Sequence, residues 1–172
     1  MDLTILNLIH GFTGKSKIID VLGSFLADYW GYFIILAVLV IIWQLGSSKK
    51  RIYYSLFIIL TVIISRGIIA QLIRFFYFKP RPFVTLGFEP LLAQNPAEAA
   101  FPSGHMSVYF ALILPLFLIN KRWGWYGVAA VSLMGLSRVF VGVHWPSDII
   151  GGMAVALVSF YIVKFLFRSY KV

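Results

Sequence analysis

The chain of 172 residues contains no cysteine and only six acidic residues. Without cysteine it can form neither a disulfide framework nor a thiol nucleophile. The acids are Asp2, Asp20, Asp28, Glu89, Glu98 and Asp148. Only Asp148 lies in a cluster of other polar residues, whereas a two-metal site needs several carboxylate or histidine ligands close together. We therefore expect no metal ion and no other cofactor.

Charged residues are scarce throughout: they make up 12% of the chain, against 60% hydrophobic residues. A soluble domain is nearer half apolar and a quarter charged, so the composition indicates an integral membrane protein, with residues 1–172 as one domain. The net charge of +9 would suggest nucleic acid in a soluble protein. Here the basic residues lie between apolar runs, which indicates topology signals and anionic lipid, with no nucleic-acid partner and no obligate protein partner.

Five apolar segments approach the roughly 20 residues that a membrane helix needs. They are 26–45, 52–73, 104–120, 123–143 and 149–167. In the N-terminal stretch 3–26, glycines, lysines and an acid leave the apolar runs too short to cross. We expect an interfacial amphipathic segment there, with a sixth span as the alternative. The sequence thus predicts an all-α, polytopic membrane helical bundle of five or six transmembrane helices.

Basic residues predict the orientation of this bundle. Residues 49–51 and 121–122, with Lys164, Arg168 and Lys171 in the tail, all fall at one set of helix ends. Cytoplasmic ends of membrane helices are enriched in Lys and Arg. We therefore expect the C-terminus in the cytoplasm, the N-terminus outside, and the segment 75–101 as an extracytoplasmic loop.

Three short polar clusters lie at the expected outer face. The first consists of Arg74 and, after six intervening residues, Arg81-Pro82. The second is Pro102-Ser103-Gly104-His105. The third consists of Ser137-Arg138, then His144 after five intervening residues, and Asp148 after three more. Polar groups are costly near hydrocarbon, so a membrane protein keeps them for a function. Arginines, histidines and one carboxylate together suit the cleavage of a phosphate ester.

The second cluster has the form of a helix start with Ser103 as N-cap, which is also its purely structural explanation. Helix N-termini present free N–H groups and bind anions, and Gly104 would let a phosphate approach the backbone closely. His105, in the first turn, could donate a proton to a leaving oxygen.

The arginines can be explained in two ways. Arg74 or Arg81 alone could be a side chain that snorkels to the interface. However, prolines on both sides of Arg81 stiffen its backbone, and a guanidinium held in this way matches phosphate oxygens. Arg138 lies within the fourth expected span, where an arginine indicates a functional site.

His144 and Asp148 form the clearest candidate for catalysis. Asp148 falls near the first turn of the fifth expected span, where an acid also favours the helix dipole. The functional interpretation is that Asp148 holds one ring nitrogen of His144 and leaves the other as a nucleophile.

In order and spacing, the clusters resemble the signature of the type 2 phosphatidic acid phosphatase superfamily, which also includes vanadium haloperoxidases. The second and third clusters match residue for residue, whereas Arg74 stands where the family usually has Lys. The resemblance implies a two-step, metal-free reaction in which His144 attacks phosphorus, His105 protonates the leaving oxygen and Asp148 orients His144. It also implies a set of residues that hold the phosphoryl oxygens: Arg74, Arg81, Ser103, Gly104 and Arg138.

The resemblance also suggests the substrate. Small bacterial members of the family include undecaprenyl-pyrophosphate phosphatases, lipid A 1-phosphatases and phosphatidylglycerophosphate phosphatases. We therefore expect a membrane lipid phosphate as partner, and an inner-membrane enzyme whose active site faces the periplasm or the outside. One alternative is a lipid phosphotransferase that uses the same phosphohistidine. The other is a non-catalytic lipid binder, which would not need His105, His144 and Asp148 together.

Overall fold

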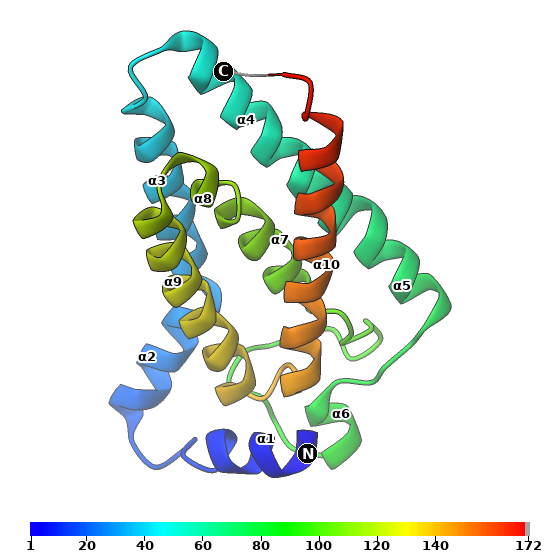
Figure 1. Cartoon of the computed structure of the whole chain (residues 1–172). Coiled ribbons are helices and arrows are strands. Elements are labelled where there is room, and N and C mark those ends of the chain that lie inside the picture. Colours follow the sequence, from blue (N-terminus) through cyan, green and yellow to red (C-terminus); the bar gives the residue numbers. More distant parts are fainter. Residues whose placement is uncertain (171–172) are drawn as a thin grey trace.

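The protein is a bundle of helices in a computed structural model that describes residues 1–170 (Figure 1). Its elements are α1 Asp2–His10, α2 Lys17–Asp28, α3 Trp30–Trp43, α4 Ser48–Val62, the π-helical η1 Ile63–Ile69, α5 Ala70–Phe76, α6 Pro82–Leu86, α7 Gly104–Ile113, α8 Leu116–Ile119, α9 Lys121–Phe140 and α10 Pro146–Leu166. Every element of this described part is helical, which confirms the all-α prediction. Lys171 of the basic tail lies outside the described residues.

Within residues 1–170, two helices are long and apolar enough to cross a membrane. They are Ser48–Phe76, which joins α4, η1 and α5 over 29 residues, and α10, with 21 residues. The bent pair of α2 and α3 would add a third if it forms one span. The apolar helix Gly104–Ile119 is shorter, and Pro115 lies between its two parts, α7 and α8. Helix α9 has 20 residues but carries three glycines and Arg138, which lower its hydropathy.

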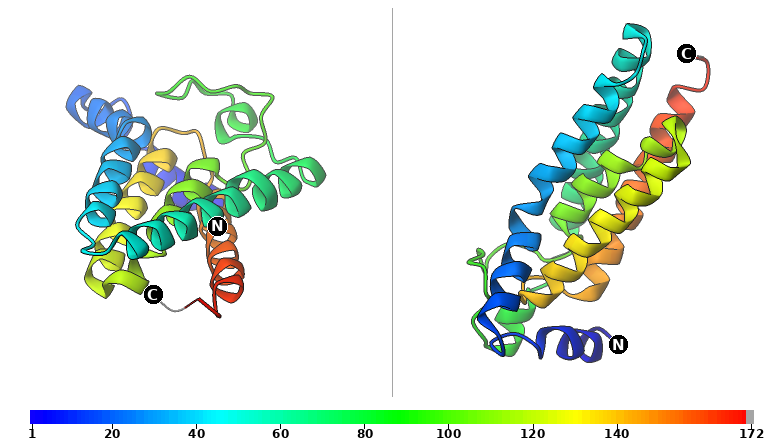
Figure 2. Two further views of the ribbon diagram at one scale, coloured as in Figure 1. Left: turned by 90° about the horizontal axis from the view of Figure 1, so that it is seen from above. Right: turned by 90° about the vertical axis from the view of Figure 1, so that its left-hand side faces the viewer.

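The N-terminal stretch differs from the expectation for 3–26. Only α1 lies across one end of the bundle, as an interfacial segment would (Figures 1 and 2). The next helix, α2, runs along the bundle and meets α3 at an angle of 47°. It packs against α9, where Gly23 leaves room for the ring of Phe140. The bent helical pair that contains the first expected span therefore begins at Lys17 rather than at residue 26.

Buried apolar side chains from α4, α7, α9 and α10 form the core. They include Phe57, Met106, Ile113, Met134 and Phe160. Large apolar side chains are also exposed on the outer faces of the helices, among them Phe33, Leu36, Ile59, Ile150 and Phe165. An apolar exterior of this kind matches hydrocarbon rather than water.

Close contact between α7 and α10 brings two of the polar clusters together. A Cβ atom on Gly152 would lie 2.6 Å from Cβ of Met106 and 2.7 Å from the carbonyl oxygen of Ser103. The missing side chain at Gly152 therefore lets the start of α7 lie directly on α10. The clusters lie toward the end of the bundle that carries α1 and α6, whereas α10 ends near the other end (Figure 1).

Candidate active site

The three polar clusters meet around a cavity of about 270 Å³. Six of the eight residues singled out in the sequence line it: Arg74, Arg81, Gly104, His105, Arg138 and His144. The other two lie directly behind. Asp148 contacts His144, and the backbone N–H of Ser103 donates to the carbonyl oxygen of Asp148 at 3.0 Å.

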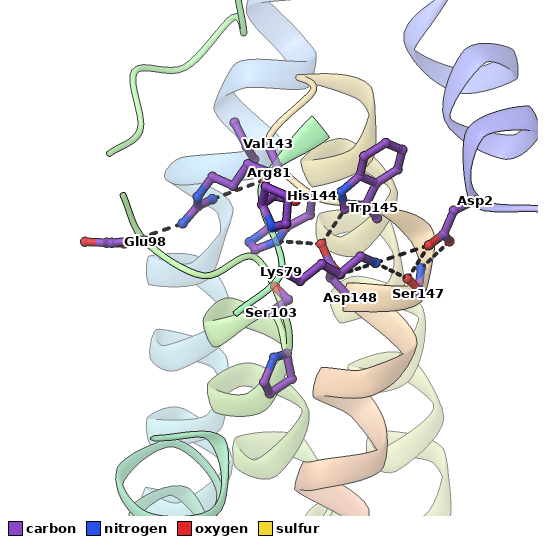
Figure 3. A network of polar contacts seen from close by, with 12 residues as sticks. Asp2, Lys79, Arg81, Glu98, Ser103, Val143, His144, Trp145, Ser147 and Asp148 are labelled. Atoms are coloured by element: carbon purple, nitrogen blue, oxygen red, sulfur yellow. Dashed lines mark hydrogen bonds and ion pairs between the residues drawn. The ribbon is translucent and has the colours of Figure 1, made fainter. Parts of the chain in front are cut away.

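His144 lies in the tight turn between α9 and α10. Gly142 makes this turn possible, because its φ of +82° falls in the left-handed region that favours glycine. Pro146 then begins α10, so Asp148 occupies the third position of that helix, and its Oδ2 accepts a hydrogen bond from the backbone N–H of Trp145 at 2.9 Å. The same Oδ2 atom lies 3.4 Å from Nδ1 of His144 (Figure 3).

Burial makes His144 a neutral imidazole at pH 7. Its side chain is 1% exposed, and burial lowers the pKa of His144 to about 4, although Asp148 acts in the opposite direction. With Asp148 beside Nδ1, the favoured tautomer carries its proton there and leaves the lone pair of Nε2 free. A neutral ring with a free Nε2 has the form that a nucleophile requires.

The N-terminus of α7 forms another wall of the cavity. Ser103 is the N-cap and is fully buried, and its hydroxyl has no hydrogen-bond partner among residues 1–170. Gly104 and His105 open the helix and line the cavity. A Cβ atom on Gly104 would lie 3.0 Å from Nε of Arg66 and 3.3 Å from Nη2 of Arg74. Two guanidinium groups therefore lie against the helix end that binds anions best.

Two further arginines are almost completely buried. Arg81 donates from Nη1 to the carbonyl oxygen of Val143 at 3.1 Å, and its Nη2 lies 3.5 Å from the carboxylate of Glu98. Burial lowers the pKa of Arg81, and Glu98 and Asp148 partly offset that effect. Arg138 donates to the carbonyl oxygen of Ala27 at 3.3 Å. Within residues 1–170, Nε of both arginines lacks a partner.

Arg74 lies at the cavity wall, and two of the five N–H donors of its guanidinium bind one backbone carbonyl. Its Nη2 and Nε donate to the carbonyl oxygen of Pro102 at 2.8 and 3.3 Å. Sequence reasoning missed a fourth cavity arginine, Arg66 in η1. The rule that singled out Arg138, an arginine within an apolar span, applies equally to Arg66 and would have found it.

Lys79 and Asp2 were also missed, and they lie beside the catalytic candidates rather than in the cavity. Nζ of Lys79 is 2.9 Å from Oδ1 of Asp148, 2.6 Å from the hydroxyl of Ser147 and 3.2 Å from Oδ2 of Asp2 (Figure 3). Asp2 is distant in sequence from all of them, so nothing in its surroundings signalled this contact. Within residues 1–170, no three His, Asp or Glu side chains gather as a metal site would require.

Comparisons with known proteins place this chain beside a family and a fold. The sequence profile described as the PAP2 superfamily matches residues 55–170. Undecaprenyl-diphosphatase BcrC of Bacillus subtilis (strain 168) is 32% identical over 171 residues, which cover 99% of this chain and 84% of that protein. A lipid A 1-phosphatase of Rhizobium etli is 29% identical over 117 residues, 63% of this chain and 50% of that protein. The crystal structure of Aquifex aeolicus LpxE superposes with a TM-score of 0.73 at 21% identity, covering 94% of this chain and 93% of that one.

Proposed function

The chain belongs to the PAP2 superfamily, whose relatives reported above are named phosphatases, and we propose that it hydrolyses the terminal phosphate of a lipid diphosphate. The observation that carries this proposal is the buried His144, whose Nδ1 lies 3.4 Å from Asp148 and which lines a cavity with four arginines and His105. Such a site combines a nucleophile, a proton donor and a cradle for phosphoryl oxygens.

In the first step, Nε2 of His144 attacks the terminal phosphorus. The bond between this phosphorus and the bridging oxygen breaks, and the lipid monophosphate leaves with a proton that His105 donates. Asp148 stabilises the positive charge that develops on the His144 ring. The cavity arginines and the first N–H groups of α7 offset the negative charge on the phosphoryl oxygens.

In the second step, water attacks the phosphohistidine. His105, now neutral, accepts a proton from that water as the phosphorus–nitrogen bond breaks. Inorganic phosphate leaves, and His144 returns to its neutral form. A lipid phosphotransferase would differ only here, because an acceptor lipid would replace water.

The charge of the cavity favours a diphosphate over a monophosphate. Its lining contains Arg66, Arg74, Arg81 and Arg138 but a single acid, Glu98. A second phosphate group supplies more negative charge to balance this excess than a monophosphate can. The relative that covers 99% of this chain is named an undecaprenyl-diphosphatase, which points to the same substrate class.

The direct test is phosphate release by the purified protein from a panel of lipids. We expect the fastest release from undecaprenyl diphosphate, and slower release from lipid A, phosphatidylglycerophosphate and phosphatidic acid. His144→Ala should abolish release from all of them. Full activity of His144→Ala would exclude the mechanism. Faster phosphate release from lipid A than from undecaprenyl diphosphate would show that the substrate is lipid A instead.

We further propose that this reaction needs no metal and takes place at the outer face of a bacterial inner membrane, with anionic lipid around the basic helix ends. Excess chelator should leave phosphate release unchanged, whereas vanadate, which mimics pentacoordinate phosphorus, should inhibit it. Loss of activity with chelator and its recovery with a divalent metal would overturn the metal-free mechanism.

A further inference from the structure

Lys79 links the catalytic carboxylate to the N-terminal helix. It lies between α5 and α6, and its side chain is only 19% exposed. Its ammonium group bridges Asp148 in α10 and Asp2 in α1, at 2.9 and 3.2 Å. Asp2 in turn accepts hydrogen bonds from the backbone N–H and the hydroxyl of Ser147, in the first turn of α10 (Figure 3).

These contacts hold both oxygens of Asp148. Lys79 binds Oδ1, and the backbone N–H of Trp145 binds Oδ2. The Lys79 ammonium also lies 5.6 Å from the centre of the Trp145 ring. Nε1 of Trp145 donates a hydrogen bond to the carbonyl oxygen of Pro80 at 3.0 Å. The segment that carries Lys79 is therefore fastened to the turn that carries His144, and the carboxylate cannot rotate away from the ring.

Asp2, Lys79 and Asp148 together carry one net negative charge. A lone lysine beside Asp148 would weaken the attraction between that carboxylate and a positively charged His144. Asp2 counters this effect. Burial alone would raise the pKa of Asp2, but hydrogen bonds from Ser147 and Lys79 lower it, so Asp2 is ionised at neutral pH. Two carboxylates and one ammonium leave a single negative charge, equal to that of an isolated Asp148.

We propose that Lys79 is a positioning residue for Asp148 and that α1, through the charge of Asp2, helps to set the charge balance at His144. This inference rests on the proposed role of His144 as the nucleophile. It makes the helix across the end of the bundle part of the catalytic apparatus, although α1 contributes no residue to the cavity lining.

The test compares Lys79→Met with Asp2→Asn in the full-length protein. Both changes remove the Lys79–Asp2 ion pair, and Lys79→Met also removes the Lys79–Asp148 pair. A purely structural role therefore predicts a loss of thermal stability in each variant and an unchanged pH profile. Electrostatic coupling instead predicts opposite shifts in the acid limb of kcat/KM, which reports the deprotonation of His144. Lys79→Met should move this limb to higher pH and Asp2→Asn to lower pH, each by about half a pH unit.

Other charged and titratable groups around His144 stay the same in both variants. They are His105 and Tyr109 from α7, Arg138 from α9, Arg66 and Arg74 from η1 and α5, Arg81 and Glu98 from the segment between α5 and α7, and His10 from α1, which lies beside the turn at Gly142. The ionisation of the substrate is also common to all variants. A difference between the acid limbs therefore reports the Asp2–Lys79–Asp148 group.

Asp20→Asn is the matched control, because Asp20 is another acid of the N-terminal region and binds the exposed backbone N–H of Gly14. It should leave the acid limb in place, and Lys79→Arg, which keeps the charge, should do the same. Equal shifts of the acid limb in the same direction in both variants, or no shift of the acid limb in Asp2→Asn, would overturn the inference. The Asp2→Asn result tests the inference by itself if Lys79→Met does not fold. Failure of the proposed function would appear separately, as full activity of His144→Ala.

Discussion

At the scale of single residues, the site depends on opposed effects on one imidazole. Burial keeps His144 neutral, while Asp148 at 3.4 Å stabilises the ring when it becomes charged. A fully solvated histidine would be partly protonated near neutral pH, and a buried one without a carboxylate would resist the positive charge of a phosphohistidine. The turn through Gly142 and Pro146 imposes both conditions at once.

His105→Asn should separate the two chemical steps. The leaving group of a lipid diphosphate is itself a phosphate, so the first step depends little on a proton donor, whereas the attack of water needs a base. We expect turnover to fall by about 10²- to 10⁴-fold while phosphohistidine accumulates on the protein. Radiolabelled substrate followed by an alkaline quench, which preserves phosphohistidine, would measure this.

His144→Ala is the matched control for that experiment. It should carry no label under any condition. Equal labelling of His144→Ala and His105→Asn would place the phosphoryl group elsewhere.

Arg66→Ala tests the preference for two phosphates. The loss of a charge-assisted hydrogen bond costs about 1.5–3 kcal/mol, which corresponds to a fall of roughly 10- to 100-fold in kcat/KM for a lipid diphosphate. Phosphatidic acid, with one phosphate, should lose much less. Arg122→Ala, which removes an exposed arginine from the start of α9, should change neither value. An equal loss on both substrates would assign Arg66 to the reacting phosphate instead.

At the scale of elements, the site is built where helices depart from regular geometry or come unusually close. The π-helical η1 interrupts the long helix from Ser48 to Phe76 and carries Arg66 to the cavity. Such segments are often found at functional sites because the wider turn re-aims side chains. Ser65, next to Arg66, is buried and donates to the carbonyl oxygen of Ser107 at 2.8 Å, which fastens η1 to α7.

Gly152→Ala should loosen the contact between α7 and α10. The new methyl group would meet Cβ of Met106 and the carbonyl oxygen of Ser103 at distances that real structures avoid. Overpacking of this kind typically costs about 1–3 kcal/mol, and it would also move the N-terminus of α7 away from Asp148. We expect a lower melting temperature in detergent together with slower phosphate release.

Gly67→Ala is the control for stability, because a Cβ atom there lies no closer than 3.9 Å to Ile63. It should leave the melting temperature unchanged or raise it slightly, since alanine favours helices over glycine. Equal melting temperatures for the two alanine variants would show that the contact between α7 and α10 tolerates a side chain.

At the scale of the whole molecule, the turn that carries His144 and the C-terminal end of α10 lie at opposite ends of the bundle. The turn between α9 and α10 lies at the end with α1 and α6, and α10 ends near the other (Figures 1 and 2). This separation agrees with a lipid phosphatase whose headgroup site opens at one membrane surface while its basic helix ends face anionic lipid at the other.

The orientation can be tested with single cysteines, since the chain has none of its own. We expect Ala97→Cys, in the exposed loop near the cavity, to react with a membrane-impermeant maleimide in intact cells. Ser48→Cys, at the start of α4, should react only after the membrane is permeabilised. The reverse pattern would place the active site in the cytoplasm.

The sequence by itself determined the helical class and the family, and it supplied the residues proposed for the site, six of which line one cavity. These properties are local. Apolar runs of sufficient length predict membrane helices. The four-residue spacing from His144 to Asp148 places His144 in the turn before the last helix and Asp148 in the first turn of that helix. The order of the clusters was enough to propose the nucleophile, the proton donor and the phosphate-binding residues.

Only the tertiary structure decided which groups from distant segments support that chemistry. Lys79 reaches Asp148 across 69 positions of sequence, and Asp2 reaches Ser147 across 145. No periodicity or spacing encodes such contacts, because they depend on how α1, α7 and α10 pack together. The wider turn at η1 and the bend between α2 and α3 likewise follow from packing between helices, which is the property that a local pattern of residues does not contain.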